Sequence, residues 1–406
     1  MLFQSENEMQ KWIELNLAEH HGLLSIIENA NEIKEYDAKN NIEQKIKNSF
    51  TLCLECLESL DVISTDQNIS VNNKDIIRPD IIAYSTNRSS LVLMELKNIK
   101  GPTRQAGTEL SAYAAELKGY LSHLSDGDII NVIISCEWPT LLKHYIFNTI
   151  VWQHKNLICL EPFLNTSTEM IKLRCKEIET IIQTDIPERF ASQHLEGFHV
   201  CLYDSSLGNK PARESQLHDK FDLIKISMEM IATESEKDHS HGFAILCKKN
   251  DITNVPYVIT IVNASGFASI ERHFHSRNFG TVEDLPIIGR CIHDINENYS
   301  NTGFTASNMK AYNRAKNTLN KICTPRIEGP NTWSELQEFT NSPYNEKVHI
   351  ELWGIFKEKF FEIANDSFKD TGYSLSTDIN TMQSVIDSMI DKDYKHIRIV
   401  NYDEDM

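Results

Sequence analysis

The feature that most constrains the fold is a pair of short apolar runs between Asp75 and Asn98. The first run is "RPDIIAYS", the second is "SLVLMELK", and the polar tetrapeptide "TNRS" joins them. Each run has the length and composition of a β-strand, and a short polar link favours a turn. The sequence therefore predicts an antiparallel β-hairpin here.

The position of the turn determines which side chains of the hairpin face one another. With Asn87 and Arg88 at the tip, Asp80 lies directly opposite Glu95. Opposed residues of an antiparallel pair share a face, with Cβ atoms about 4.5 to 5.5 Å apart. The two-residue period of a strand places Lys97 on that face as well. A slip of one residue would instead turn the two carboxylates to opposite faces.

Two facing carboxylates favour a bound cation. Their repulsion costs stability, and a hard divalent ion such as Mg²⁺ removes that cost while it binds oxygen ligands. We expect Asp80, Glu95 and the main-chain carbonyl of Leu96 to bind Mg²⁺, with Mn²⁺ as a substitute. Such an ion activates water and neutralises charge on an attacked phosphate. We expect Lys97 to position the water and stabilise charge, because a base would need a pKa far below about 10.4.

A second Glu-Leu-Lys triplet, which begins at Glu116 and ends at Lys118, provides an internal comparison. It lies in "TRQAGTELSAYAAELKGYLSHL", where apolar residues recur at helical spacing. Residues two apart do not face each other on a helix. Only the triplet that begins at Glu95 therefore has the geometry to assemble a site.

Apolar periodicity divides the chain into helices and strands. Residues 1–35 are expected to form an N-terminal helical element, and an amphipathic helix follows from Tyr36. After the hairpin, "TRQAGTELSAYAAELKGYLSHL" and "TLLKHYIFNTIVWQ" have helical patterns, while "DIINVIISCEW" and "KNLICLEPF" have the composition of buried strands. This order predicts an α/β domain over residues 36–165, with a mixed central sheet flanked by helices.

The remainder is predicted to hold a helical connector, residues 166–197, and a second α/β or α+β domain, residues 198–406. The connector contains "STEMIKLRCKEIETIIQTD", and Pro187 marks its end. In the second domain "FHVCLYDS", "GFAILCKK" and "PYVITIVNAS" have strand patterns. The segments "QLHDKFDLIKISMEMIAT", "TASNMKAYNRAKNTLNKI" and "KVHIELWGIFKEKFFEIANDSF" have helical patterns.

The Pro-Asp pair at Asp80, followed by Glu-Leu-Lys at 95–97, resembles the PD-(D/E)XK nuclease superfamily. Its core is a mixed sheet with helices on both faces, the restriction-endonuclease-like fold. The resemblance covers residues 36–163, under a third of the chain, and its motif is short. It implies Mg²⁺-dependent hydrolysis of phosphodiester bonds, in DNA by preference over RNA.

The resemblance also implies functional residues on the helices that flank the hairpin. Members often carry an acidic residue on the preceding helix, and Glu43 fits this role best, with Glu35 and Asp37 as alternatives. Many carry a polar residue on the following helix, which Gln105 fits. Tyr113 follows Gln105 by eight positions. Some members space this Gln and Tyr by four, so the match is incomplete here.

Net charge is the main observation against a nuclease. The formal charge is −18 at pH 7, whereas a protein that holds phosphates usually shows a basic surplus somewhere. In "NMKAYNRAKNTLNKICTPR", Lys310, Arg314 and Lys321 fall on one helical face and apolar residues fall on another. We expect this basic stripe to contact nucleic acid. The alternative is an ordinary solvated helix face.

Other bulk features indicate a cytoplasmic protein without membrane association. No apolar run approaches the roughly 18 residues of a membrane span, and the N-terminus has no secretory signal pattern. Recognition domains fused to nucleases are common in restriction and antiviral defence proteins. By that analogy we expect a nucleic-acid substrate, and the architecture leaves room for an activating protein partner or a homo-oligomer.

Two alternatives to catalysis remain open. Asp80 could simply begin a strand, while Glu95 and Lys97 could be an edge pair that discourages aggregation. A nuclease-like fold could also serve as a non-catalytic interaction or nucleic-acid-binding module, because fold does not determine function. The alignment of all three side chains on one face favours catalysis.

Overall fold

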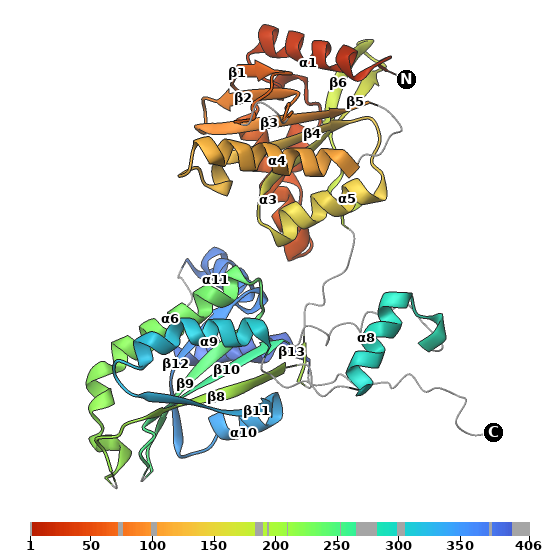
Figure 1. Cartoon of the computed structure of the whole chain (residues 1–406). Helices are drawn as coiled ribbons and strands as arrows, with labels where there is room; N and C mark the ends of the chain where they lie inside the picture. The colour runs from red at the N-terminus through yellow and green to blue at the C-terminus, as the bar shows by residue number, and fades with distance from the viewer. Residues whose placement is uncertain are drawn as a thin grey trace, which may run out of the picture. The chain divides into compact units, whose positions relative to one another are not determined.

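A computed structural model describes residues 2–71, 76–98, 104–182, 190–192, 195–208, 210–251, 253–264, 282–298, 305–372 and 376–391. The chain divides into two compact units, Met1–Asp185 and Ile186–Met406 (Figure 1). A mixed sheet with helices forms the first, and an antiparallel sheet with helices forms the second, so the expected fold class is confirmed. Among the helices within these ranges, none has the length and hydrophobicity of a transmembrane span.

The first unit is built on a six-stranded sheet in the order β1-β2-β3-β4-β5-β6. Its neighbours pair antiparallel except β3 with β4 and β4 with β5, which are parallel. The strands are β1 (Leu60–Thr65), β2 (Ile81–Ser85), β3 (Ser90–Lys97), β4 (Ile129–Ser135), β5 (Asn156–Asn165) and β6 (Met170–Cys175). The helices are α1 (Glu6–His20), α2 (Ala30–Glu35), α3 (Asn41–Cys56), α4 (Arg104–Tyr120) and α5 (Thr140–Phe147).

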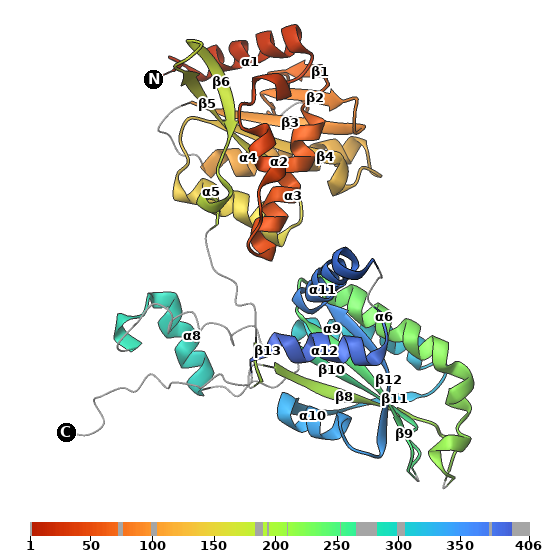
Figure 2. The same cartoon turned by 180° about the vertical axis from the view of Figure 1, so that it is seen from behind.

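Helices cover both faces of this sheet. α4 packs against β3 and β4 on one face, and α3 packs against β5 on the other, next to α2 (Figures 1 and 2). Every residue of β4 is buried, as is usual for a parallel strand between two helical layers. The carboxyl ends of β3 and β4 therefore emerge side by side from a closely packed interior.

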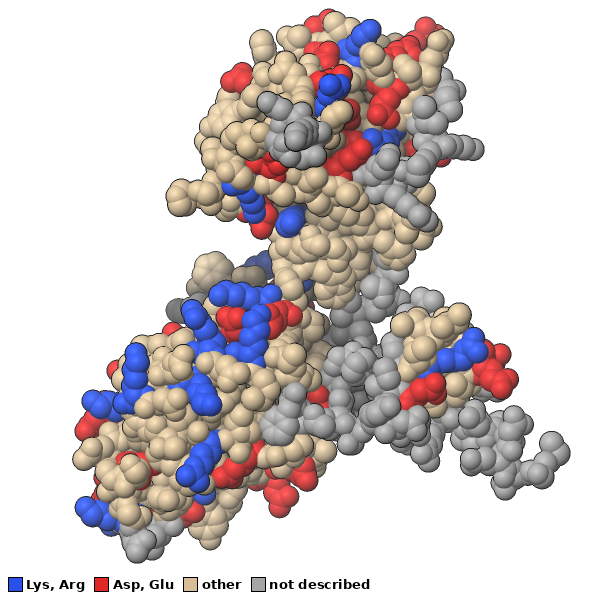
Figure 3. Space-filling model, in the orientation of Figure 1, with Lys and Arg blue, Asp and Glu red and all other residues tan. Residues whose placement is uncertain are grey.

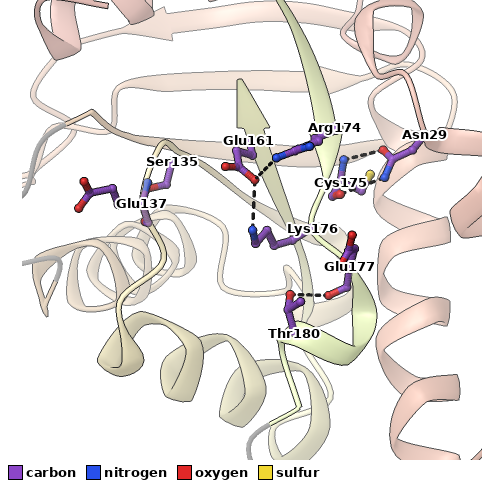
Figure 4. Close-up of polar contacts among 9 residues, drawn as sticks. All are labelled: Asn29, Ser135, Glu137, Glu161, Arg174, Cys175, Lys176, Glu177 and Thr180. Carbon is purple, nitrogen blue, oxygen red and sulfur yellow. Dashed lines mark hydrogen bonds and ion pairs between the residues drawn. The ribbon is translucent and has the colours of Figure 1, made fainter. Parts of the chain in front are cut away.

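The N-terminal segment belongs to the first unit. One side of α1 is buried in the first unit, through Met9, Ile13 and Leu17. Between α1 and α3, Asn29 Nδ2 donates to the Cys175 carbonyl at 3.0 Å, and Asn29 Oδ1 accepts from the Cys175 N–H at 2.7 Å (Figure 4). This asparagine thus satisfies main-chain groups that the edge strand β6 would otherwise leave unpaired.

The prediction of a helical connector over residues 166–197 is wrong. Residues 170–175 form β6, which pairs antiparallel with β5. Leu173 and Cys175 are buried while Arg174 between them is exposed, a strand pattern of period two. Because β6 completes the first sheet, the first unit extends to Asp185 rather than ending near residue 165.

The second unit contains a sheet in the order β11-β8-β10-β9-β12, in which all neighbours are antiparallel. Its strands are β8 (Leu195–Tyr203), β9 (Gly242–Lys249), β10 (Tyr257–Ala264), β11 (Thr324–Thr332) and β12 (Asn345–Trp353). Its helices include α6 (Phe221–Lys237), α8 (Ile287–Asn298), α9 (Ala306–Leu319), α10 (Trp333–Thr340), α11 (Ile355–Thr371) and α12 (Ile379–Met389). A short parallel pair, β7 (Phe190–Ala191) with β13 (Ile390–Asp391), joins the two ends of the unit.

Two hydrophobic clusters give the second unit three layers. On one face of the sheet, α6 and α9 pack against residues such as Phe198 and Ile259. On the other face, α10, α11 and α12 cover Phe243 of β9 and Val262 of β10. One helix expected here begins later than predicted, because the segment "KVHIELW" is part of β12 and α11 begins only after Gly354.

Candidate active site

The β2-β3 hairpin has the predicted register. The ladder runs from Ile81 opposite Met94 to the two serines next to the turn, as the turn position requires. One residue before β2, Asp80 is therefore level with Glu95 near the end of β3. This register was the condition on which a shared face for the carboxylates depended.

A main-chain hydrogen bond holds the Asp80 side chain at the end of β3. Asp80 Oδ2 accepts a hydrogen bond from the Leu96 N–H at 2.7 Å. On the opposite side of β3, the Lys97 carbonyl accepts from the Cys136 N–H at 3.2 Å. Because successive residues of a strand direct their main-chain groups to opposite neighbours, the Leu96 carbonyl is directed toward the β2 side, where Asp80 lies.

The Lys97 side chain is surrounded by carboxylates from three elements. Its Nζ forms an ion pair with Glu95 of β3 and lies 3.3 Å from Glu109 Oε2 of α4. Glu6 Oε1, in the first turn of α1, is 3.8 Å from the same nitrogen. The Glu95 side chain is only 2% exposed and that of Lys97 is 17% exposed. These charges therefore interact in surroundings that screen them much less than water does.

Burial and crowding shift the pKa values of these groups. Burial raises the pKa of Asp80 to about 6, with a main-chain hydrogen bond and the Lys97 charge in opposition. Burial, the Asp80 charge and Glu109 raise the pKa of Glu95 well above its usual range. Burial lowers the pKa of Lys97, but Glu95 and the other carboxylates outweigh it and raise the pKa overall. Lys97 is therefore a cation at neutral pH, which suits charge stabilisation better than proton abstraction.

The end of β3 fits a hard divalent cation. Glu95 Oε2 is buried and has no hydrogen-bond partner among the residues that the structure describes. Mg²⁺ or Mn²⁺ held by Asp80, Glu95 and the Leu96 carbonyl would pair this atom and offset the repulsion between the carboxylates. Within the described ranges, no three His, Cys, Asp or Glu side chains are arranged as a metal site. The ion would therefore depend on two carboxylates and one carbonyl.

Two residues of this cluster were not predicted from the sequence. Glu109 lies one helical turn before Tyr113, at the four-residue spacing that some members of the superfamily have between a Gln and a Tyr on this helix. The Tyr113 hydroxyl donates to the Arg78 carbonyl at 2.9 Å, which anchors α4 beside the start of β2. That spacing was the signal available for Glu109. Glu6 has no comparable local signal, because its approach depends on how α1 docks.

The described contacts of Glu43 are with groups around the start of α3, so its expected role in the site stays a prediction. Glu43 Oε2 accepts from the Lys39 N–H at 2.7 Å and from the Tyr36 hydroxyl at 3.0 Å. Its own N–H donates to Asn40 Oδ1 at 2.9 Å, so Asn40 is the N-cap of α3 and Glu43 lies in the first turn of the helix. Among the described contacts, none joins Glu43 to the carboxylates near β3. Gln105 lies on α4, but its side chain is outside the described residues.

A second ionic cluster lies two strands away from Lys97 in the same sheet. Glu161 of β5 forms ion pairs with Arg174 at 3.3 Å and with Lys176 at 3.1 Å (Figure 4). Between the two clusters lies β4, in which Ser135 is the parallel partner of Lys97. Two cations share one carboxylate in this cluster, so it carries net positive charge.

One of the three cations in the predicted basic stripe of the second unit is already paired with carboxylates. Lys310 forms ion pairs with Asp238 and, at 3.5 Å, with Glu234 of α6. Arg314 is exposed on α9, and Lys321 is exposed just after the helix ends. The apolar side of α9 packs into the core as predicted. Lys310 is thus the least suited of the three to bind an external anion.

Comparison with known proteins adds no relative. Neither the family models nor the curated proteins nor the solved structures contain a match to this chain. The side chains at the end of β3, with their burial and their charges, are therefore the observations that bear on function.

Proposed function

We propose that the first unit is a Mg²⁺-dependent nuclease that hydrolyses phosphodiester bonds, in DNA by preference over RNA. The observation that carries this proposal is the gathering of Asp80, Glu95 and Lys97 at the end of β3, in the register that the hairpin imposes. By analogy with other fused nucleases, we place the protein in restriction or antiviral defence.

Each residue has a distinct role in this proposal. Asp80, Glu95 and the Leu96 carbonyl hold Mg²⁺, or Mn²⁺ in its place. The bound ion supplies Lewis acidity toward the attacked phosphate. The Lys97 ammonium orients the attacking water and stabilises negative charge that develops on the phosphate. Glu109 keeps the Lys97 ammonium in position, since its Oε2 lies 3.3 Å from Nζ.

Cleavage assays on the full chain test this proposal. Purified protein is incubated with plasmid DNA or RNA in the presence of Mg²⁺ or Mn²⁺, and again with EDTA. Lys97→Ala and Asp80→Ala should each reduce the cleavage rate by about 100-fold or more, the usual effect of losing one charge-stabilising or ion-binding group. EDTA should abolish cleavage by the wild-type protein.

Lys118→Ala provides a matched control. Lys118 ends the second Glu-Leu-Lys triplet, but it lies on α4 and pairs with Asp126 at 2.7 Å. This variant loses the same side chain at a position outside the proposed site, so its cleavage rate should equal that of the wild type. Equal rates for the wild type and Lys97→Ala would refute the role of Lys97.

A non-catalytic interaction module is the second candidate. It is favoured by the position of Lys97 Nζ among the carboxylates, where it contacts Glu95, Glu109 and Glu6. Calorimetric titration with Mg²⁺ separates the two functions. A binding event that Glu95→Gln removes supports the nuclease, even if cleavage requires an activating partner. If the protein neither binds Mg²⁺ nor cleaves nucleic acid, the non-catalytic interaction module is the supported function.

A further inference from the structure

The exposed side of α9 is free of carboxylates in an otherwise acidic protein. Between Lys310 and Lys321, every exposed residue is a lysine, an arginine or an asparagine. The whole chain carries a formal charge of −18, so such a surface is unlike the chain average. Lys and Arg side chains gather on the face of the second unit that carries α6 and α9 (Figure 3).

Packing holds this surface in a defined position. Ala311, Tyr312, Ala315 and Leu319 are buried on the opposite side of α9. At the start of the helix, the Thr305 side chain accepts a hydrogen bond from a main-chain N–H. A helix anchored along its length presents its exposed side chains as a fixed row, which lowers the entropic cost of binding a regular ligand.

The cations of α9 differ in how far they are already engaged. Lys310 is paired with the carboxylates of α6, and Lys316 Nζ lies 5.8 Å from the centroid of the Tyr312 ring. In the part of the chain that the structure describes, Arg314 and Lys321 form no ion pair. These two residues therefore keep their full charge for an external anion.

We propose that the surface formed by Asn313, Arg314, Asn317, Asn320 and Lys321, here called the α9 surface, binds the phosphate backbone of a polynucleotide. The two cations attract phosphates, and the three asparagine amides add neutral hydrogen-bond donors. Side chains of these types supply most contacts to nucleic-acid backbones, and such contacts do not depend on base sequence. The identity of the polyanion rests on the proposed nuclease function.

Binding measurements on the full chain in EDTA test the α9 surface without cleavage. A fluorescein-labelled DNA duplex is titrated at several NaCl concentrations, and its anisotropy gives the affinity at each. The double variant Arg314→Ala/Lys321→Ala should bind about 10-fold more weakly at low salt. The slope of log affinity against log salt should flatten by about 0.9 for each phosphate that the variant no longer neutralises.

A second titration distinguishes DNA from RNA as the source of the phosphates. A single-stranded RNA of matching sequence replaces the duplex, and its expected slope change is about 0.7 per phosphate. Tighter binding of the duplex supports DNA, and tighter binding of the RNA supports RNA, under the same proposal. If the full chain binds neither at low salt, the proposal is overturned and the α9 surface fits an acidic protein partner instead.

A charge-matched control comes from α11, on the opposite face of the second sheet. Lys359→Ala/Lys369→Ala removes two lysines that pair with Glu362 at 3.0 Å and Asp366 at 3.7 Å. The change in net charge equals that of the α9 variant, but the salt slope should stay at its wild-type value. If both double variants flatten the slope equally, net charge alone explains the effect and the α9 surface has no specific role.

The nuclease and the α9 surface can fail independently. An unchanged salt slope for Arg314→Ala/Lys321→Ala contradicts the α9 surface even if the wild-type protein cleaves DNA. Conversely, a flattened slope in a protein that neither cleaves nor binds Mg²⁺ contradicts only the nuclease. Both residues are exposed, so circular dichroism of the variant should match that of the wild type.

Discussion

Asp80 illustrates how the proposed site lowers the stability of the folded protein in the absence of a cation. Its pKa of about 6 in the folded protein lies above the value of about 3.9 expected when the chain is unfolded. The folded state therefore retains the proton to higher pH than the unfolded state does. Between these two pKa values, the free energy of unfolding decreases as pH rises, and above about pH 6 the penalty is fully present.

Asp80→Asn should remove this penalty. The asparagine Oδ1 can still accept the Leu96 N–H, but it carries no charge. In EDTA, we expect the variant to be more stable than the wild type by about 1 to 2 kcal/mol above pH 6 and equally stable near pH 4. Urea unfolding at both pH values measures the difference. A gain of the same size at both would show that charge is not its cause.

Glu43, Glu109 and Glu6 show how far single residues could be assigned from the sequence. Asn40 and Glu43 have the spacing of a capping box, so local chemistry already explains an acid at this position. Glu109 could have been predicted from its four-residue spacing to Tyr113 in the sequence. Glu6 could not, because only the packing of α1 brings it within 3.8 Å of Lys97 Nζ.

At the scale of elements, α4 is the helix that brings Glu109 and Tyr113 to the end of β3. Its approach to α5 depends on Gly107, since a Cβ there would lie 2.5 Å from the Tyr145 ring. In the same helix, a Cβ on Gly119 would meet no atom within 4 Å. The two glycines therefore differ in packing while they share the helix.

Gly107→Ala and Gly119→Ala should have opposite effects on stability. Alanine is favoured over glycine in a helix, so Gly119→Ala should increase the free energy of unfolding by about 0.5 to 1 kcal/mol. Gly107→Ala should decrease it by about 1 to 3 kcal/mol, because the new methyl group forces the Tyr145 ring to move. Urea unfolding of the full chain measures both. Equal stabilisation by the two variants would show that α4 does not pack closely against Tyr145.

Elements with strong local patterns were predictable, and edge strands were not. The hairpin, α3, α4, β4 and α6 have the periodicity expected of them in the sequence. By contrast, β6 and β12 are edge strands, each with one neighbouring strand. Edge strands mix polar and apolar residues, so their sequences also match an amphipathic helix. Pairing with the adjacent strand β5 decides in favour of a strand for β6, and pairing with β9, a distant segment, does so for β12.

At the scale of the whole molecule, the two units have separate cores and separate proposed roles. Ligands stabilise only the structure that binds them, by an amount that grows with ligand concentration above the dissociation constant. The proposed ion ligands all belong to the first unit. Mg²⁺ should therefore affect the two units unequally.

Hydrogen exchange followed by mass spectrometry should detect this difference. Addition of Mg²⁺ should slow exchange in peptides that cover β2 and β3, and leave exchange in β8, β9 and β10 unchanged. Glu95→Gln should remove the protection in the first unit. Equal protection of both units would contradict an ion site confined to the end of β3.

The sequence by itself determined the mixed sheet of the first unit, the hairpin register and the shared face of Asp80, Glu95 and Lys97. These features depend on local periodicity and on one short turn, so a few neighbouring residues suffice to specify them. Only the tertiary structure decided that Glu6 approaches Lys97, that β12 rather than a helix forms an edge of the second sheet and that Lys310 pairs with Glu234 and Asp238. Those outcomes require segments far apart in the chain to meet, and the free energy that brings them together comes from burying apolar faces whose partners no local pattern identifies.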